Sequence, residues 1–168
     1  MRLTPFPIRY EELNELYAHT DQRRCLNAIP VPLDEAMSRS YFLAVRTGNN
    51  DGRSFVCYAI EQDGRIIGKI EATKETEQRA ELDLIIRSEY CGRGHGSEAL
   101  NAFIEELKQN GWCEELCAYA ESGNLAMKRA LEKNGFSCER TFQADVITPG
   151  QSQYQLRSVQ GEEYLRCL

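Results

Sequence analysis

Cys91-Gly-Arg-Gly-His-Gly-Ser-Glu98 is the stretch that decides the fold, because it joins two segments with different hydrophobic patterns. The preceding run, residues 80–86, is apolar and β-prone, whereas residues 97–107 carry apolar side chains at helical spacing. A glycine loop between a strand and a helix turns several main-chain N–H groups toward one point at the helix N-terminus. Such a loop suits a diphosphate, and glycine lets the phosphates approach the backbone closely.

Two familiar phosphate-binding loops do not match this stretch. The dinucleotide fingerprint needs Gly-x-Gly-x-x-Gly, and the P-loop needs Gly-Lys followed by Ser or Thr, whereas the glycines here run Gly-x-Gly-x-Gly. The stretch resembles instead the loop of the GNAT N-acetyltransferases, whose motif reads Gln/Arg-x-x-Gly-x-Gly/Ala, with Cys91 in place of Gln or Arg. The resemblance implies that the loop amides hold the pyrophosphate of acetyl-CoA. The alternative is a strand–helix turn that uses glycine only to bend.

A second segment strengthens the resemblance. Residues 121–136 are similar to the family's other signature, Asn-x-x-Ala-x-x-x-Tyr-Glu-Lys-x-Gly-Phe. The positions that fit are Asn124, Ala126 (one place early), Glu132, Lys133, Gly135 and Phe136. The pattern predicts a helix that starts at Asn124 and stops at Gly135. The resemblance implies that Asn124 contacts pantetheine or its surroundings, and the alternative is an ordinary helix cap.

The rest of the chain predicts alternating helices and strands. We expect strands over residues 3–9, 54–60, 65–72, 78–87, 115–120 and within 137–168, where the last strand covers 161–168. We expect one or two helices over 10–27 and another over 33–45, with breaks or turns at 29–32, 48–52, 63–64 and 148–150. The predicted fold class is α/β (α+β) in one domain, residues 1–168. The resemblance implies a mixed central sheet of six to seven strands flanked by helices, with parallel strands that splay apart at the acetyl-CoA site.

Composition excludes several classes of function. The 168 residues carry a net charge of −6, which argues against a general nucleic-acid binder and mildly favours a cationic acceptor. No apolar run approaches the ~20 residues that cross a bilayer, and no signal-peptide region opens the chain. Seven scattered cysteines without a Cys-x-x-Cys pair indicate reduced thiols in a cytoplasm and no metal site. The oligomeric state stays open, although homodimers are common in the family.

The resemblance assigns a set of acetyl-CoA contacts. A main-chain N–H on the strand before the loop would polarise the thioester carbonyl as it becomes an oxyanion, which points to Ile85, Ile86 or Arg87. The loop contacts for the pyrophosphate would be Gly92, Arg93, Gly94, His95, Gly96 and Ser97. Arg93 adds a charge that suits phosphate, and Lys133 is a further candidate for a CoA phosphate.

Catalysis needs a base for the acceptor amine, and three carboxylates are candidates. Glu71 is the first choice and Glu81 the second, while Asp83 could line the acceptor entrance. Each of them is equally explained as a solvated acid on the polar face of a strand. Tyr119 could serve as an acid or a lining residue. Many GNAT enzymes carry, at the position of Leu131, a tyrosine that protonates the departing thiolate, and leucine cannot donate a proton.

The leading hypothesis is an acetyl-CoA-dependent N-acetyltransferase that works by direct attack of a primary amine. The segment from residue 79 to 94 is similar to the branch with ribosomal-protein N-terminal and spermidine acetyltransferases. The acceptor is therefore a protein N-terminus, a polyamine or another small amine, with neither nucleic acid nor membrane as a partner. Two alternatives stay open: a non-catalytic acetyl-CoA sensor and a Rossmann-like nucleotide binder.

Overall fold

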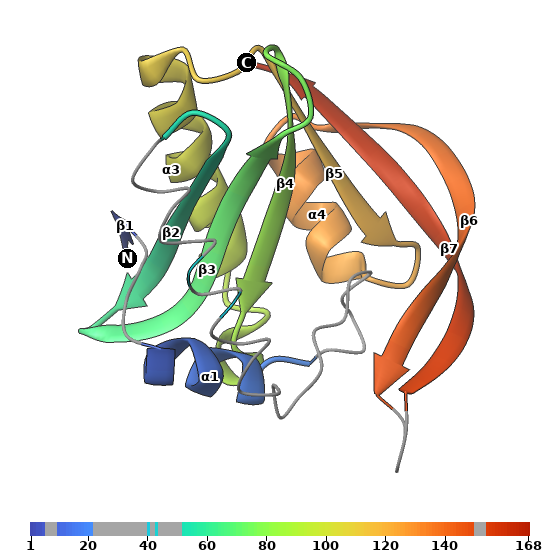
Figure 1. Ribbon diagram of the computed structural model, residues 1–168, viewed down its shortest axis with the longest axis horizontal. Helices are drawn as coiled ribbons and strands as arrows, with labels where there is room; N and C mark the ends of the chain where they lie inside the picture. The colour runs from blue at the N-terminus through green and yellow to red at the C-terminus, as the bar shows by residue number, and fades with distance from the viewer. Residues whose placement is uncertain (6–9, 22–39, 41–42, 44–51, 150–153) are drawn as a thin grey trace.

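The computed structural model describes the chain except for residues 6–9, 22–39, 41–42, 44–51 and 150–153 (Figure 1). The predicted break at residues 29–32 lies outside the described residues. So do nearly all of the predicted helix over 33–45, most of the loop at 48–52 and the end of the turn at 148–150.

A mixed sheet forms the centre of the described molecule. Its strands are β1 (Arg2–Pro5), β2 (Phe55–Gln62), β3 (Arg65–Lys74), β4 (Arg79–Ile86), β5 (Glu115–Glu121), β6 (Ser137–Pro149) and β7 (Tyr154–Cys167). They are arranged in the order β1-β2-β3-β4-β5-β7-β6, and every neighbouring pair is antiparallel except β4 and β5. The predicted fold class and the expected mixed sheet are confirmed.

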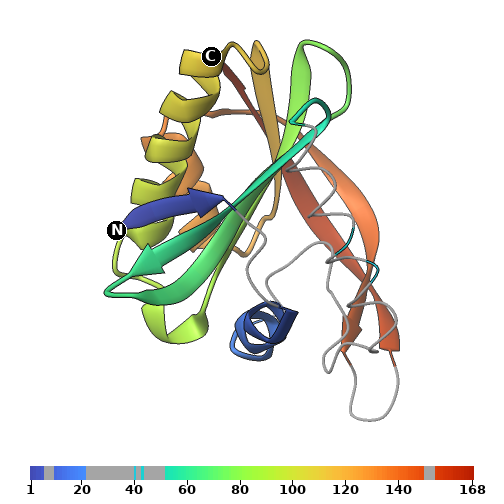
Figure 2. The ribbon, with the colours of Figure 1, turned by 60° about the vertical axis from the view of Figure 1, so that its left-hand side comes forward.

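Helices lie on both faces of this sheet (Figures 1 and 2). They are α1 (Tyr10–Ala18), α3 (His95–Asn110) and α4 (Leu125–Lys133), with a short 3-10 turn, η2 (Ser88–Tyr90), before the glycine loop. The apolar stripe of α3 packs on the main core, which holds Ile70, Leu82 and Leu116. Leu13, Leu16 and Tyr17 of α1 pack on Cys57, Ala59 and Ile85, which belong to the opposite face of the sheet. The face under α1 is therefore separate from the face that carries α3 and α4.

The two parallel strands separate part-way along their length. β4 and β5 pair only from Arg79 with Glu115 to Leu82 with Ala118. Beyond that point β4 continues alongside β3 as far as Ile86, and β5 continues alongside β7 as far as Glu121. The predicted splay of the parallel strands is therefore present, and Figure 1 shows the opening between the ends of β4 and β5.

Local signals placed most elements correctly. Asp63 and Gly64 have φ of 50° and 75°, as a two-residue hairpin turn requires, and they join β2 to β3. The prediction of the last strand was wrong, because β7 starts at Tyr154 rather than at residue 161. The early part of β7 pairs with β6 alone, from Tyr154 opposite Pro149 to Gln160 opposite Gln143. This long pairing is not visible in the pattern of either strand by itself.

Candidate active site

The loop between β4 and α3 presents a row of unpaired main-chain donors. The N–H groups of residues 92–97 donate to no acceptor among the described residues, and the next one, that of Glu98, bonds to the Gly94 carbonyl at 3.0 Å. The first N–H groups of a helix have no partner within the helix, and the helix dipole adds positive potential at this end. A row of such donors can bind an anion with several negatively charged oxygens.

The three glycines of this loop have different roles. Gly92 and Gly94 have φ of 76° and 89°, and a Cβ on either would meet nothing within 4 Å. Backbone conformation, rather than crowding inside the protein, is what requires glycine at these two positions. Gly96 lies within α3, where a Cβ would be 3.6 Å from Leu84 Cδ2 and 3.7 Å from Ile86 Cγ1. Both distances are ordinary van der Waals contacts, so an alanine would fit at this position.

A buried amide fixes the start of α3, and the sequence reasoning missed it. Asn134 ends α4 and is 7% exposed. Its Nδ2 donates to the Ser97 carbonyl at 3.2 Å, to Ser97 Oγ at 3.0 Å and to the Ala130 carbonyl at 2.7 Å. From the sequence we predicted only that the helix stops at Gly135, which agrees with its φ of 79°, and made no prediction for Asn134.

The other predicted cofactor residues lie near this loop or on α4. Arg93 is exposed, with its guanidinium 5.8 Å from the centre of the Tyr90 ring, and the half-buried His95 ring lies 6.1 Å from the same ring. Asn124 caps α4, because its side chain accepts from the Met127 N–H at 3.2 Å. Lys133 is exposed in the last turn of α4. The structure therefore shows Asn124 as an ordinary helix cap.

The pairing of β3 with β4 shows in which direction each of the three candidate N–H donors on β4 points. The Arg87 N–H donates to the Ile67 carbonyl at 2.8 Å, so it points toward β3. Successive residues of a strand direct their N–H groups to opposite sides, so the Ile85 N–H also points toward β3. The Ile86 N–H points the other way, into the gap where β5 has separated from β4. Of the three, only Ile86 has the orientation that a thioester carbonyl in this gap would need.

The first-choice base, Glu71, is held by a buried lysine. Lys69 is 1% exposed, and its Nζ lies 2.7 Å from Glu71 Oε2 and 3.5 Å from Asp83 Oδ2. The same ammonium lies 5.8 Å from the centre of the Tyr17 ring. The Glu71 carboxylate is therefore already engaged in an ion pair within the protein.

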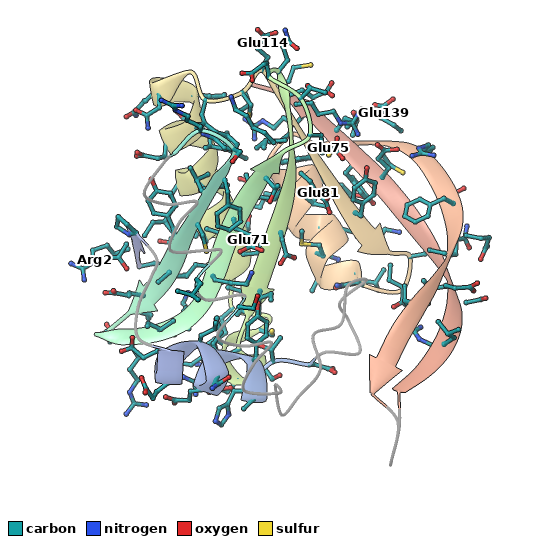
Figure 3. All side chains as sticks on the ribbon, viewed as in Figure 1. Arg2, Glu71, Glu75, Glu81, Glu114 and Glu139 are labelled. Atoms are coloured by element: carbon teal, nitrogen blue, oxygen red, sulfur yellow. The ribbon has the colours of Figure 1, made fainter. Side chains whose placement is uncertain are left out.

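Glu81 is in a different environment. Its neighbour Leu82 belongs to the last pair before the strands separate, and Glu81 itself stands opposite Cys117. The side chain is half-buried and forms no ion pair with any residue that the structure describes. Burial and the nearby carboxylates, first that of Glu75 and then that of Asp83, raise the pKa of Glu81. Figure 3 shows Glu71, Glu75 and Glu81 along the middle of the sheet.

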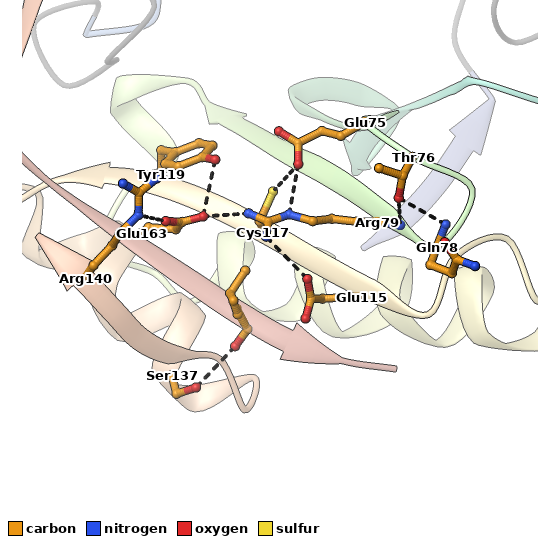
Figure 4. Close-up of polar contacts among 11 residues, drawn as sticks. Glu75, Thr76, Gln78, Arg79, Glu115, Cys117, Tyr119, Ser137, Arg140 and Glu163 are labelled. Carbon is orange, nitrogen blue, oxygen red and sulfur yellow. Dashed lines mark hydrogen bonds and ion pairs between the residues drawn. The ribbon is translucent and has the colours of Figure 1, made fainter. Parts of the chain in front are cut away.

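Tyr119 is the first residue of β5 beyond the last pair with β4. Its hydroxyl donates to Glu163 Oε1 at 3.4 Å (Figure 4). Burial, followed by the Cys117 and Glu163 charges, raises the pKa of Tyr119 to about 12. An ordinary thiol has a pKa of about 8.5, so proton transfer from this phenol to a thiolate is uphill. These properties argue against the predicted role as an acid and leave a hydrogen-bonding role.

Comparison with known proteins decides the family. The model of the acetyltransferase (GNAT) domain matches residues 2–137. The chain belongs to the GNAT acetyltransferase family. The predicted family is confirmed, and with it the class of enzyme, an acetyl-CoA-dependent acyltransferase. A comparison with curated protein sequences finds no match.

Solved structures share this GNAT fold over nearly the whole chain. A ribosomal-protein-alanine N-acetyltransferase from Brucella melitensis is 18% identical, with a TM-score of 0.72 and full coverage of both chains. The ribosomal L7/L12 α-N-protein acetyltransferase RimL, in complex with coenzyme A, is 14% identical with a TM-score of 0.80, covering 99% of this chain and 93% of the other. The microcin C7 self-immunity acetyltransferase MccE, with acetyl-CoA and AMP, is 16% identical with a TM-score of 0.75, covering 99% and 92%.

Within this GNAT domain, the position that many family members give to tyrosine is apolar. Leu131 is fully buried in the core between α4 and the sheet. Cys117 also offers little nucleophilic chemistry. Burial raises the pKa of Cys117 to about 11, and Cys91 is exposed, with its Sγ 3.5 Å from the Arg87 carbonyl. A thiol with a raised pKa is a poor nucleophile at neutral pH.

Neither a metal-binding group nor a membrane-spanning helix is present among the described residues. They contain no group of His, Cys, Asp and Glu side chains that could hold a metal ion. None of the helices in this part of the chain is both long and apolar enough to span a membrane.

Proposed function

We propose that the protein transfers an acetyl group from acetyl-CoA to a primary amine by direct attack of the amine on the thioester. The observation that carries the proposal is the pair of features at one end of the sheet: the unpaired N–H groups of residues 92–97 and the gap between β4 and β5. The first would hold the pyrophosphate, and the second would admit pantetheine beside the free edge of β4.

In this arrangement the Ile86 N–H would donate to the thioester oxygen as negative charge develops on it. We propose Glu81 as the base that removes the amine proton, directly or through water, in preference to Glu71. Glu81 has no ionic partner among the described residues and has a raised pKa, whereas Glu71 forms an ion pair with Lys69. A carboxylate whose pKa lies closer to neutrality is a more effective base near that pH.

The acceptor that we propose is a primary amine that is cationic in solution and attacks after losing its proton. It is a protein N-terminus, a polyamine or another small amine. Support comes from Glu81 and from Asp83, whose side chain is 56% exposed, on the face that faces α1. The similar structures include a ribosomal-protein-alanine N-acetyltransferase and a ribosomal L7/L12 α-N-protein acetyltransferase, which supports the first of these acceptors. The six described cysteines form no disulfide with one another, which supports a reducing cytoplasm as the location.

One observation favours a second candidate, a sensor that binds acetyl-CoA without turnover. Leu131 cannot protonate the thiolate, and Tyr119, with its raised pKa, is poorly suited to do so. A CoA thiolate is stable enough near neutral pH to leave without a proton, so the acetyltransferase remains the better-supported candidate.

Thiol release separates the two candidates. The protein is incubated with acetyl-CoA and, one at a time, with a peptide bearing a free N-terminus, a polyamine and an aminoglycoside. Sustained release of CoA with one class of amine is the expected result. Saturable binding of acetyl-CoA without release, across the whole panel, would favour the sensor.

A further inference from the structure

A buried carboxylate lies on the same side of the sheet as Glu81 and Tyr119. Glu163 of β7 is 5% exposed and stands opposite Tyr119 in the β5–β7 pairing. It accepts from Arg79 Nη2 at 2.5 Å, from Arg140 Nε and from the Tyr119 hydroxyl at 3.4 Å (Figure 4). These contacts come from β4, β6 and β5, so Glu163 connects four strands at the point where β4 and β5 separate. The two arginines hold the pKa of Glu163 below its usual range although burial opposes this.

The ring of Tyr119 is held from another side. Phe142 of β6 meets it edge to face, with ring centres 5.9 Å apart and planes at 83°. Phe142 reaches Tyr119 across β7 because Gly161 has no side chain, and a Cβ there would lie 2.4 Å from Phe142 Cζ. The Arg140 guanidinium lies 5.9 Å from the centre of the Phe142 ring. The tyrosine is therefore fixed both at its hydroxyl and along its ring.

The direction of the hydroxyl hydrogen bond determines what Tyr119 can do. Its proton points at Glu163 and the Arg79 side chain also hydrogen-bonds to this phenol, so one lone pair of the oxygen is left to accept from another donor. Glu81 stands beside Cys117, and Tyr119 lies two residues further along the same face of β5. From the spacing of residues along a strand and of strands in a sheet, the backbones at Glu81 and Tyr119 are about 8 Å apart. At that spacing, side chains at the two positions can both reach a small group placed between them.

We infer, on the basis of the acetyl transfer proposed above, that the Tyr119 oxygen accepts a hydrogen bond from the incoming amine and that Glu163 is the positioning residue that orients this hydroxyl. In the reaction, the amine nitrogen bonds to the thioester carbon and the carbon–sulfur bond breaks. The amine proton goes to Glu81 and then to solvent, and CoA leaves as the thiolate. Tyr119 keeps its own proton throughout.

The test is a double-mutant cycle on KM for the amine that the wild type acetylates. Tyr119→Phe removes one hydroxyl and keeps the ring against Phe142, so we expect KM for the amine to rise about three- to tenfold. KM for acetyl-CoA should be unchanged. Glu163→Gln should raise KM for the amine in the wild-type background and have no further effect in the Tyr119→Phe background.

The matched control is Glu162→Gln. Glu162 is the neighbour of Glu163 on β7, points to the other face and pairs with Lys128 at 2.8 Å, so its loss should leave KM for the amine unaltered. Equal rises in KM for the amine and for acetyl-CoA, or additive effects of the two substitutions, would show that Glu163 is merely structural and would overturn the inference. If Glu163→Gln does not fold, Tyr119→Phe alone decides the role of the hydroxyl, because wild-type kinetics in that variant would also overturn it.

Different results would contradict the role of Tyr119 and the proposed acetyl transfer. A wild-type protein that turns over some amine, with a Tyr119→Phe variant that behaves identically, removes this inference and leaves the acetyltransferase. A wild-type protein that releases no CoA with any amine removes the proposed function, and the inference falls with it.

Discussion

The side-chain amide of Asn134 lies 3.0 Å from Ser97 Oγ and 3.2 Å from the Ser97 carbonyl oxygen. It connects the C-cap of α4 to the first turn of α3, 37 residues earlier in the chain. The start of α3 carries the unpaired N–H groups, so the orientation of these donors depends on a contact made by the other helix. We therefore expect binding of the cofactor diphosphate to be coupled to the packing of α4.

Replacing Asn134 with Ala should affect both properties. Loss of a buried amide that bonds to three acceptors should destabilise the fold by about 1–3 kcal/mol. The dissociation constant for CoA should also rise, because Ser97 loses its anchor. Chemical denaturation and calorimetric titration with CoA measure the two effects. Asn110→Ala is the control, since Asn110 is exposed at the far end of α3 and bonds only to Glu106 among the described residues. Unaltered CoA affinity in Asn134→Ala would contradict the coupling.

The glycine loop can be tested with a pair of matched substitutions. Gly94 precedes α3 with φ of 89°, and Gly111 follows it with φ of 56°; a Cβ on either meets nothing within 4 Å. Alanine should strain both backbones by about 1–2 kcal/mol, so the two variants should lose similar stability. Only Gly94→Ala should weaken CoA binding, because only Gly94 belongs to the segment with unpaired N–H groups. Equal CoA affinities in the two variants would show that the phosphates bind elsewhere.

Local patterns were sufficient to predict the features of the site that depend on neighbouring residues. The Asp63-Gly64 turn, a helix after the glycine loop and the helix stop at Gly135 each follow from backbone preferences within a few residues, although α3 starts at His95 rather than at residue 97. The splay of β4 and β5 was expected only through the resemblance to GNAT enzymes, because no residue of either strand signals that pairing ends at Leu82.

Contacts between distant residues could not be predicted in the same way. Glu71 was preferred as the base because the sequence does not show that Lys69 is buried beside it rather than exposed. Glu163 lies 44 residues from Tyr119 and had no motif that pointed to it. Such pairs are set by strand order and register, which emerge only when the whole sheet is assembled.

The ion pair of Lys69 with Glu71 should contribute strongly to stability. Lys69→Met leaves Glu71, whose side chain is 12% exposed, without its counter-charge, so we expect a loss of about 3–5 kcal/mol. Adding Glu71→Gln should recover much of that loss, because the double variant buries no unpaired charge. Urea denaturation of the wild type, Lys69→Met, Glu71→Gln and the double variant measures this. Lys108→Met is a control, since the Lys108–Glu105 pair is 3.8 Å long and largely exposed. A double variant no more stable than Lys69→Met would mean that lost packing, rather than charge, explains the effect.

Glu81→Gln should separate catalysis from stability. Its pKa is raised by burial and by neighbouring carboxylates, so the folded protein holds the Glu81 proton more tightly than the unfolded chain does. Ionised Glu81 therefore disfavours folding, and this effect is absent below the unfolded pKa and grows as pH rises through the folded pKa. Glutamine is never charged, so Glu81→Gln should melt above the wild type at pH 7 and level with it near pH 4.

The same variant should lose activity, because the amine proton has no acceptor at that position. We expect kcat/KM for the amine to fall about 100-fold at neutral pH, with CoA affinity unchanged. Glu71→Gln provides the comparison, since it should lose stability by removing the nearer of the two carboxylates beside the buried Lys69 and should retain more turnover than Glu81→Gln. Melting curves from pH 4 to 8 and steady-state kinetics on both variants complete the test. Wild-type turnover in Glu81→Gln would show that Glu81 is not the base. A Glu81→Gln protein less stable than the wild type at pH 7 would show that the pKa of Glu81 is not raised by burial.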